Sequence, residues 1–170
     1  MSARPEPRRA DAVDAVVEQW ARVRPDLDAA GMEVFGRIHR LARVMGDRHE
    51  QVYAPYGISR GEFDVLAALR RAGEPYTLSP RQLSAGLMLT TGGMTGRLDK
   101  LEGAGLLRRS PDPHDRRGLQ VTLTEEGLRL ADEAVGAGAA EQSRALAALG
   151  PERAAQLADL LRELLLATER

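Results

Sequence analysis

The sequence predicts a mainly α-helical fold that carries one small β-hairpin. Three observations support this fold class. Only 4% of the 170 residues are aromatic, and Ala and Leu supply most apolar positions, a balance that favours helix over sheet. Apolar residues recur at helical spacing in several stretches. Residues 119–124, "LQVTLT", instead alternate apolar and polar side chains after a charged loop, which is typical of a hairpin strand.

Two helices are expected at the start of the chain. Residues 1–10 are rich in Pro and Arg and predict a disordered tail. Over residues 11–23, valines and Trp20 share one helical face, and "RPDLD" ends this helix. A longer helix is expected over residues 30–52. At 1.5 Å per residue it would be roughly 35 Å long, which is more than a small core needs.

Three shorter helices follow, each with a recognisable start. The sequence "SRGE" at 59–62 is a capping box for a helix that stops at Gly73. The sequence "SPRQ" at 79–82 repeats the box, with a proline at the first helical position. Thr90 or Thr91 begins the fifth helix, which ends at Gly103 or Gly105. Its apolar stripe consists of Met94, Leu98 and Leu101.

The hairpin and two further helices complete the chain. Residues 106–109 and 119–124 are the expected strands, joined by the loop "SPDPHDRRG". Thr124 caps a helix that runs toward Leu149. The last helix starts at Pro151 and carries leucines at i, i+3, i+4 and i+7, namely Leu157, Leu160, Leu161 and Leu164.

This order of elements indicates a winged helix-turn-helix with long helices on either side. The outer helices have more apolar face than the small central core can cover, so a second copy related by two-fold symmetry is expected to cover it. The predicted organisation is a disordered tail (1–10), N-terminal dimerisation helices (11–55), a DNA-binding region (56–124) and C-terminal dimerisation helices (125–170).

The fifth helix and the hairpin tip are the candidate contacts with double-stranded DNA. With its apolar stripe turned inward, the helix offers Thr90, Thr91, Thr95 and Lys100 to a major groove. At the hairpin tip, Arg116 and Arg117 project toward the minor groove, whose negative potential attracts guanidinium groups, and Asp115 would brace one of them. Two other interpretations of the tip are a solvated turn and a metal site formed by Asp112, His114 and Asp115. The metal site lacks a helical His/Glu pair and a cysteine, so no metal is expected.

Composition excludes several other classes of function. The chain has no cysteine, which excludes disulfides, thiolate nucleophiles and cysteine-ligated zinc. No nucleophile, phosphate loop or pair of catalytic carboxylates is recognisable, so neither an enzyme nor a cofactor is expected. No signal peptide and no apolar stretch of membrane-spanning length is present, which predicts a cytoplasmic protein with no membrane contact.

Residues 94–127, "MTGRLDKLEGAGLLRRSPDPHDRRGLQVTLTEEG", resemble the recognition helix, wing and following helix of the MarR family of dimeric bacterial transcription regulators. The Asp-x-Arg of that family's wing falls at Asp115 and Arg117. Together with the flanking helices, the resemblance covers about residues 12–170. It implies a homodimeric, DNA-binding regulator.

Three stretches, at 18–44, 62–80 and 94–102, are similar to the urate-responsive branch of that family, the PecS- and HucR-like regulators. The resemblance implies a site for an anionic purine formed by Trp20, Asp64, Arg97 and Arg109. Two guanidinium groups and an indole suit a flat anion through bidentate pairing and stacking. Asp64 would balance the arginines in the empty site, because unpaired charge is costly when buried.

The predicted function is that of a repressor which a small anion, urate or a related purine, releases from a palindromic operator. Ligand binding is expected to recruit Arg97 and to pull the recognition helix out of register. A di- or tricarboxylate such as aconitate or citrate is the alternative ligand, because the same two arginines would hold it. A winged-helix module that binds protein without any ligand is the alternative function.

Overall fold

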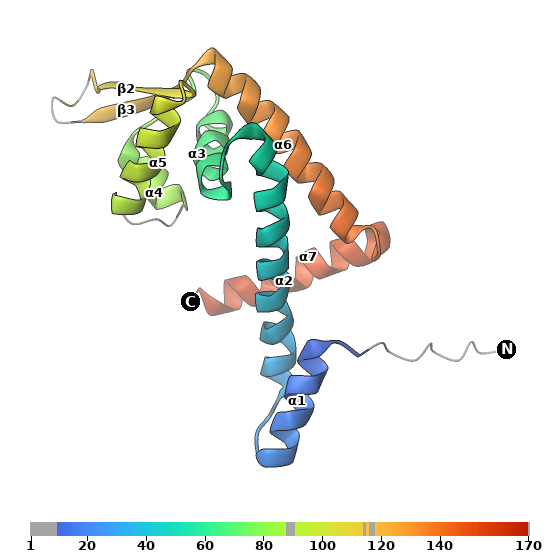
Figure 1. Ribbon diagram of the computed structural model, residues 1–170. Coiled ribbons are helices and arrows are strands. Elements are labelled where there is room, and N and C mark those ends of the chain that lie inside the picture. Colours follow the sequence, from blue (N-terminus) through green and yellow to red (C-terminus); the bar gives the residue numbers. More distant parts are fainter. Residues whose placement is uncertain (1–9, 88–90, 114, 116–117, 170) are drawn as a thin grey trace. The chain divides into compact units, whose positions relative to one another are not determined.

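The computed structural model describes residues 10–87, 91–113, 115 and 118–169 (Figure 1). The predicted tail lies outside these ranges except for Ala10. Among the described residues the secondary structure is mostly helical with one small antiparallel sheet, so the predicted fold class is confirmed. The chain divides into two compact units, Met1–Asp47 and Arg48–Arg170.

The first unit consists of α1 (Ala12–Val23) and the first part of α2 (Ala30–Tyr53). Asp11 caps α1, and Asp14 completes the capping box by accepting a hydrogen bond from the Asp11 N–H at 2.7 Å. Arg37 of α2 pairs with both carboxylates, at 2.9 Å to Asp11 and 2.6 Å to Asp14. This pairing holds the start of α1 against α2.

Helices α1 and α2 pack closely at Val13 in the first unit. Val13 lies against Gly36, where an added Cβ would stand 2.9 Å from the valine Cγ1. Val13 is also the only residue described in this unit that is buried. The other large apolar side chains are at least partly exposed. The most exposed of them are Val16, Trp20, Val23, Leu27, Val34, Phe35, Leu41 and Val44.

The second unit begins with the end of α2 and four short helical segments. The predicted capping boxes form: Ser59 Oγ accepts from the Glu62 N–H, and Ser79 Oγ accepts from the Gln82 N–H. Buried apolar residues from these helices and from the sheet make up the core. The segments are η1 (Ala54–Tyr56), α3 (Arg60–Arg71), α4 (Pro80–Leu87) and α5 (Thr91–Gly103).

The sheet has the strand order β1-β3-β2, with β1 at Thr77–Leu78, β2 at Leu107–Pro111 and β3 at Leu119–Leu123. The hairpin β2–β3 was predicted, and in its register Arg109 lies opposite Val121. Strand β1 was not predicted, because two residues carry no alternating pattern and its pairing with β3 is a tertiary contact.

Two long helices, α6 (Glu125–Leu146) and α7 (Gly150–Thr168), follow the wing. Thr124 caps α6: its Oγ1 accepts a hydrogen bond from the Gly127 N–H and donates one to the carbonyl of Gly105. Helix α6 packs on α3, and its small residues Ala131 and Ala134 are fully buried.

Helix α7 has no buried residue. Its exposed leucines are Leu160, Leu161, Leu165 and Leu166. None of the helices in the described part of the chain combines the length and the apolar character needed to cross a bilayer.

Candidate DNA and ligand site

Helix α5 is held by the predicted apolar stripe. Met94, Leu98 and Leu101 are all buried, and α5 packs on α3, α4 and β2. The opposite face is open: Thr95 is exposed, and nothing lies within 4 Å of a Cβ added at Gly96. Burial of one face therefore determines which side chains of α5 are presented to a partner.

Arg97 lies against the first turn of α3. A Cβ added at Gly61 would stand 2.6 Å from Cζ, 2.7 Å from Nη2 and 2.8 Å from Nε of Arg97. These nearly equal distances place the face of the guanidinium on the glycine, which leaves room for it only because it has no side chain. Within the described part of the chain, this half-buried cation has no hydrogen bond or ion pair.

Lys100, one turn further along α5, also faces the start of α3. Its Nζ lies 3.4 Å from Oε1 of Glu62, whose other carboxylate oxygen accepts the N–H of Ser59 at 2.8 Å. Burial opposes the charge on Glu62, which is only 7% exposed. The hydrogen bonds from Ser59 and the ammonium of Lys100 outweigh that effect and hold the pKa of Glu62 below its ordinary value.

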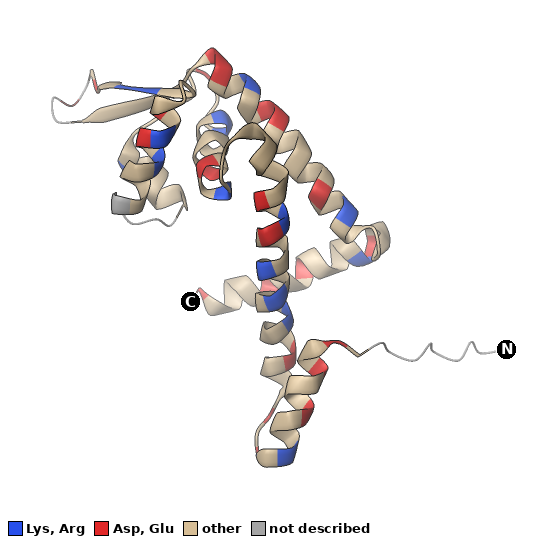
Figure 2. Cartoon of the chain, viewed as in Figure 1, with Lys and Arg blue, Asp and Glu red and all other residues tan. Residues whose placement is uncertain are grey.

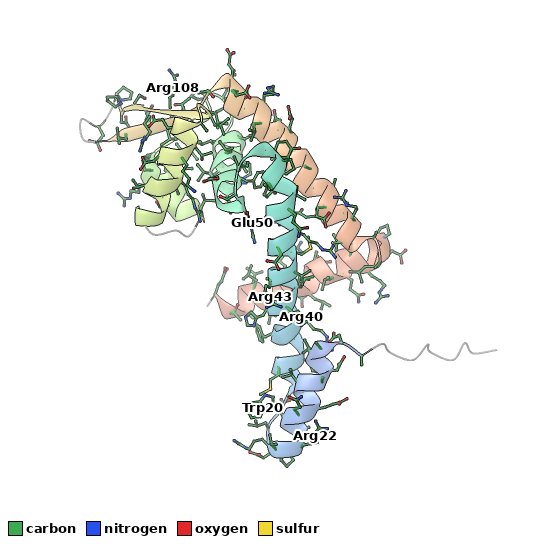
Figure 3. All side chains as sticks on the ribbon, in the orientation of Figure 1. Trp20, Arg22, Arg40, Arg43, Glu50 and Arg108 are labelled. Carbon is green, nitrogen blue, oxygen red and sulfur yellow. The ribbon has the colours of Figure 1, made fainter. Side chains whose placement is uncertain are left out.

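Arg109 of β2 is paired with two carboxylates of α5. Its Nε and Nη2 donate to Oε2 of Glu102, at 2.8 and 2.5 Å, and its Nη1 lies 2.7 Å from Oδ1 of Asp99. Its backbone N–H also donates to Oε1 of Glu102 at 2.9 Å. The hydrogen bonds from Arg109 lower the pKa of Glu102. Arg108 extends from the other face of the strand (Figure 3).

Acidic and basic residues therefore lie side by side on α5 (Figure 2). Sequence reasoning missed Asp99 and Glu102 as partners of Arg109. Residues three apart on a helix share a face, so the spacing indicated that these two carboxylates lie together, but not which cation they meet. The expected balancing group, Asp64, is half-buried on α3 and has no ion pair among the described residues. The pKa of Tyr53 is raised, first because its side chain is buried and second because the Asp64 carboxylate lies nearby.

Predicted ligand residues line two cavities. One, of about 380 Å³, is lined by residues of α4, α5 and the hairpin that include Thr95, Leu98 and Arg109. The other, of about 440 Å³ and wholly within the first unit, is lined by Trp20 and Phe35 with His39 and Arg40. Trp20 is 43% exposed there on α1 (Figure 3).

The remaining predicted residues are only partly described. Thr90, Arg116 and Arg117 lie outside the described residues, as does His114. Thr91 begins α5. The backbone carbonyl of Asp115 accepts a hydrogen bond from the Gly118 N–H at 2.8 Å. Over the described ranges, no group of three acidic or histidine side chains could hold a metal ion.

Known proteins resemble the chain in sequence and in structure. Residues 56–118 match the sequence pattern of the MarR family. The HTH-type transcriptional regulator PecS of Dickeya dadantii is 43% identical over 123 residues, which is 72% of this chain and 74% of that protein. The apo structure of MarR from E. coli has a TM-score of 0.67 and 27% identity, and the match covers 76% of this chain and 95% of that one.

A second solved structure bears on regulation by small molecules. It is that of BpsR from Bordetella bronchiseptica, whose DNA binding is described as regulated by 6-hydroxynicotinic acid. Its TM-score is 0.61 at 26% identity, and the match covers 75% of this chain and 98% of that one.

Proposed function

Because the chain belongs to the MarR family, we propose that it is a homodimeric repressor that binds a palindromic operator and leaves it when a small anion binds. The similar PecS of Dickeya dadantii is a transcriptional regulator. The observation that carries the proposal is helix α5, whose buried stripe turns an open face with Thr95 and Gly96 outward next to a β-hairpin. This is the arrangement of a winged helix that reads DNA.

In the proposed complex, α5 enters the major groove and the hairpin tip enters the minor groove. Thr90, Thr91, Thr95 and Lys100 contact bases and phosphates, and Arg116 and Arg117, braced by Asp115, supply guanidinium groups to the minor groove. The pairing of Lys100 with Glu62 leaves the lysine side chain largely exposed, so it can also reach a phosphate.

Apolar surface that the chain leaves uncovered supports the proposed dimer. Helix α7 buries none of its leucines, and the first unit exposes eight large apolar side chains. A second copy that covers these faces would present two α5 helices to half-sites about one helical turn apart, roughly 34–36 Å. The terminal regions 11–55 and 125–170 are the proposed dimerisation helices.

The proposed effector is an anion held by Arg97 and Arg109, with Asp64 and Trp20 as further ligand residues. Arg97 supports this assignment because it is half-buried and has no counter-ion in the described structure. Urate or a related purine is the first candidate, because the chain is 43% identical to PecS over the matched region. A carboxylic acid such as citrate or aconitate is the second, and a nicotinic acid derivative is named for BpsR.

The test is a DNA-binding titration. A duplex selected from a random pool by the protein itself is labelled, and its affinity is measured at two salt concentrations with and without each candidate. Urate, xanthine, hypoxanthine, citrate and aconitate are the candidates. We expect the affinity for DNA to fall steeply as salt rises, since released counterions drive binding. We also expect one of the candidates to lower the affinity for DNA at a given salt concentration. If no duplex is enriched, the alternative of a protein-binding module is favoured.

A further inference from the structure

In the structure, two carboxylates of α5, the proposed recognition helix, already pair with Arg109. Arg109 is one of the cations that the effector is proposed to bind. Each nitrogen of the Arg109 guanidinium has a carboxylate partner: Nε and Nη2 contact Glu102, and Nη1 contacts Asp99 at 2.7 Å. An anion that pairs with this guanidinium through two parallel hydrogen bonds must therefore share a nitrogen with at least one of the two carboxylates, and the like charges then repel each other.

The two carboxylates are held unequally. Glu102 has three contacts with Arg109, since it also accepts the backbone N–H, and its side chain is 35% exposed. Asp99 has a single contact and is 56% exposed. A single ion pair open to solvent is the weaker of the two, so Asp99 is the group that an incoming anion displaces.

We propose that Asp99 is a built-in competitor of the effector, and that its displacement from Arg109 helps to release DNA. Once displaced, Asp99 leaves an uncompensated negative charge on the recognition helix, where it repels the phosphates of the operator. Asp99 is thus a positioning residue that converts anion binding into weaker DNA binding. This inference rests on the proposed function, because it requires an anionic effector at Arg109.

The proposal predicts that Asp99→Asn raises the affinity for the anion and reduces the effect of the anion on DNA binding. Without its competitor, Arg109 should bind the anion more tightly, about tenfold for the loss of one charge-assisted pair. The asparagine carries no charge to repel DNA, so the same variant should lose less DNA affinity at saturating anion than the wild type does. A merely structural role for Asp99 would not produce this combination.

The experiment uses the full chain with urate and with citrate as probes. Isothermal titration without DNA measures probe affinity, and fluorescence anisotropy measures the ratio of DNA affinities without and with saturating probe. The ratio is taken within each variant, because removing a charge also changes basal DNA binding. Glu126→Gln is the matched control, since Glu126 pairs with Arg129 at 2.5 Å on α6 and is 54% exposed.

We expect Asp99→Asn to bind one probe more tightly and to show a smaller affinity ratio, with Glu126→Gln equal to the wild type. If the wild type responds to a probe and Asp99→Asn has the same probe affinity or the same ratio, the competitor role is overturned while the proposed function stands. If neither protein binds either probe, the anionic effector itself is wrong and the inference fails with it.

Discussion

A Cβ added at Gly127 would lie 1.8 Å from the carbonyl oxygen of Leu106. The first turn of α6 thus touches the backbone directly before β2, and the N–H of Thr124 donates to the same carbonyl. Only glycine permits this approach, because a side chain would overlap the backbone. This contact joins the start of the hairpin to the long helix that follows it.

Gly127→Ala should therefore destabilise the protein by about 3 kcal/mol, as expected for overpacking against a backbone that cannot move aside. The melting temperature should fall by roughly 6–12 °C for a chain of this size. Differential scanning calorimetry measures both values. The control is Gly136→Ala on the same helix, which has open space around its Cβ position and should be neutral or slightly stabilising. Equal melting temperatures for the two variants would contradict the contact.

Arg97→Ala should keep DNA binding and lose most of the response to the effector. Arg97 is part of α5, but its guanidinium lies against Gly61 of α3, so its removal leaves in place the side chains that we propose face DNA. The measurement is DNA affinity as a function of effector concentration. Arg71→Ala, an exposed arginine at the end of α3, is the control. A variant that leaves DNA at the wild-type effector concentration would show that Arg97 is not needed for release.

Glu62 should contribute to stability in a pH-dependent way. Its pKa in the folded protein lies below the ordinary value of 4.5, so it stabilises the fold above about pH 4.5 and this contribution is lost as the pH falls through the lowered pKa. Glu62→Gln keeps the capping interaction but cannot pair ionically with Lys100. Urea unfolding at pH 7 and pH 4 should show a smaller pH dependence for this variant than for the wild type, with a loss of roughly 1 kcal/mol at pH 7. An unchanged pH dependence would exclude Glu62 as a contributor.

Leu160→Glu should shift the protein from the proposed dimer to a monomer. Leu160 is 57% exposed on α7 in the single chain, so a charge there costs little unless a second copy buries it. Sedimentation velocity measures the change in mass, and DNA affinity should fall with it because both half-sites are needed. Gln156→Glu, an exposed position on the same helix, adds the same charge as a control. A dimer that survives Leu160→Glu would place the interface elsewhere.

Local patterns predicted the helices, the caps and the hairpin. The boxes at Ser59 and Ser79 form as expected, and the stripe of Met94, Leu98 and Leu101 is buried. These features depend on residues three or four apart in the chain, and the spacing of such residues is visible in the sequence itself.

The ion pairs and close approaches of the candidate site depend on tertiary structure. That Arg109 meets Asp99 and Glu102 rather than Asp64, and that Arg97 lies on Gly61, follows from how β2 and α3 pack around α5. The sequence determined the helices, the hairpin and their apolar faces, but not strand β1, which depends on its pairing with β3. Charged side chains, by contrast, have many possible partners of similar energy. The packing of those elements alone decided which charges meet, because an ion pair requires a geometry that residue spacing does not encode.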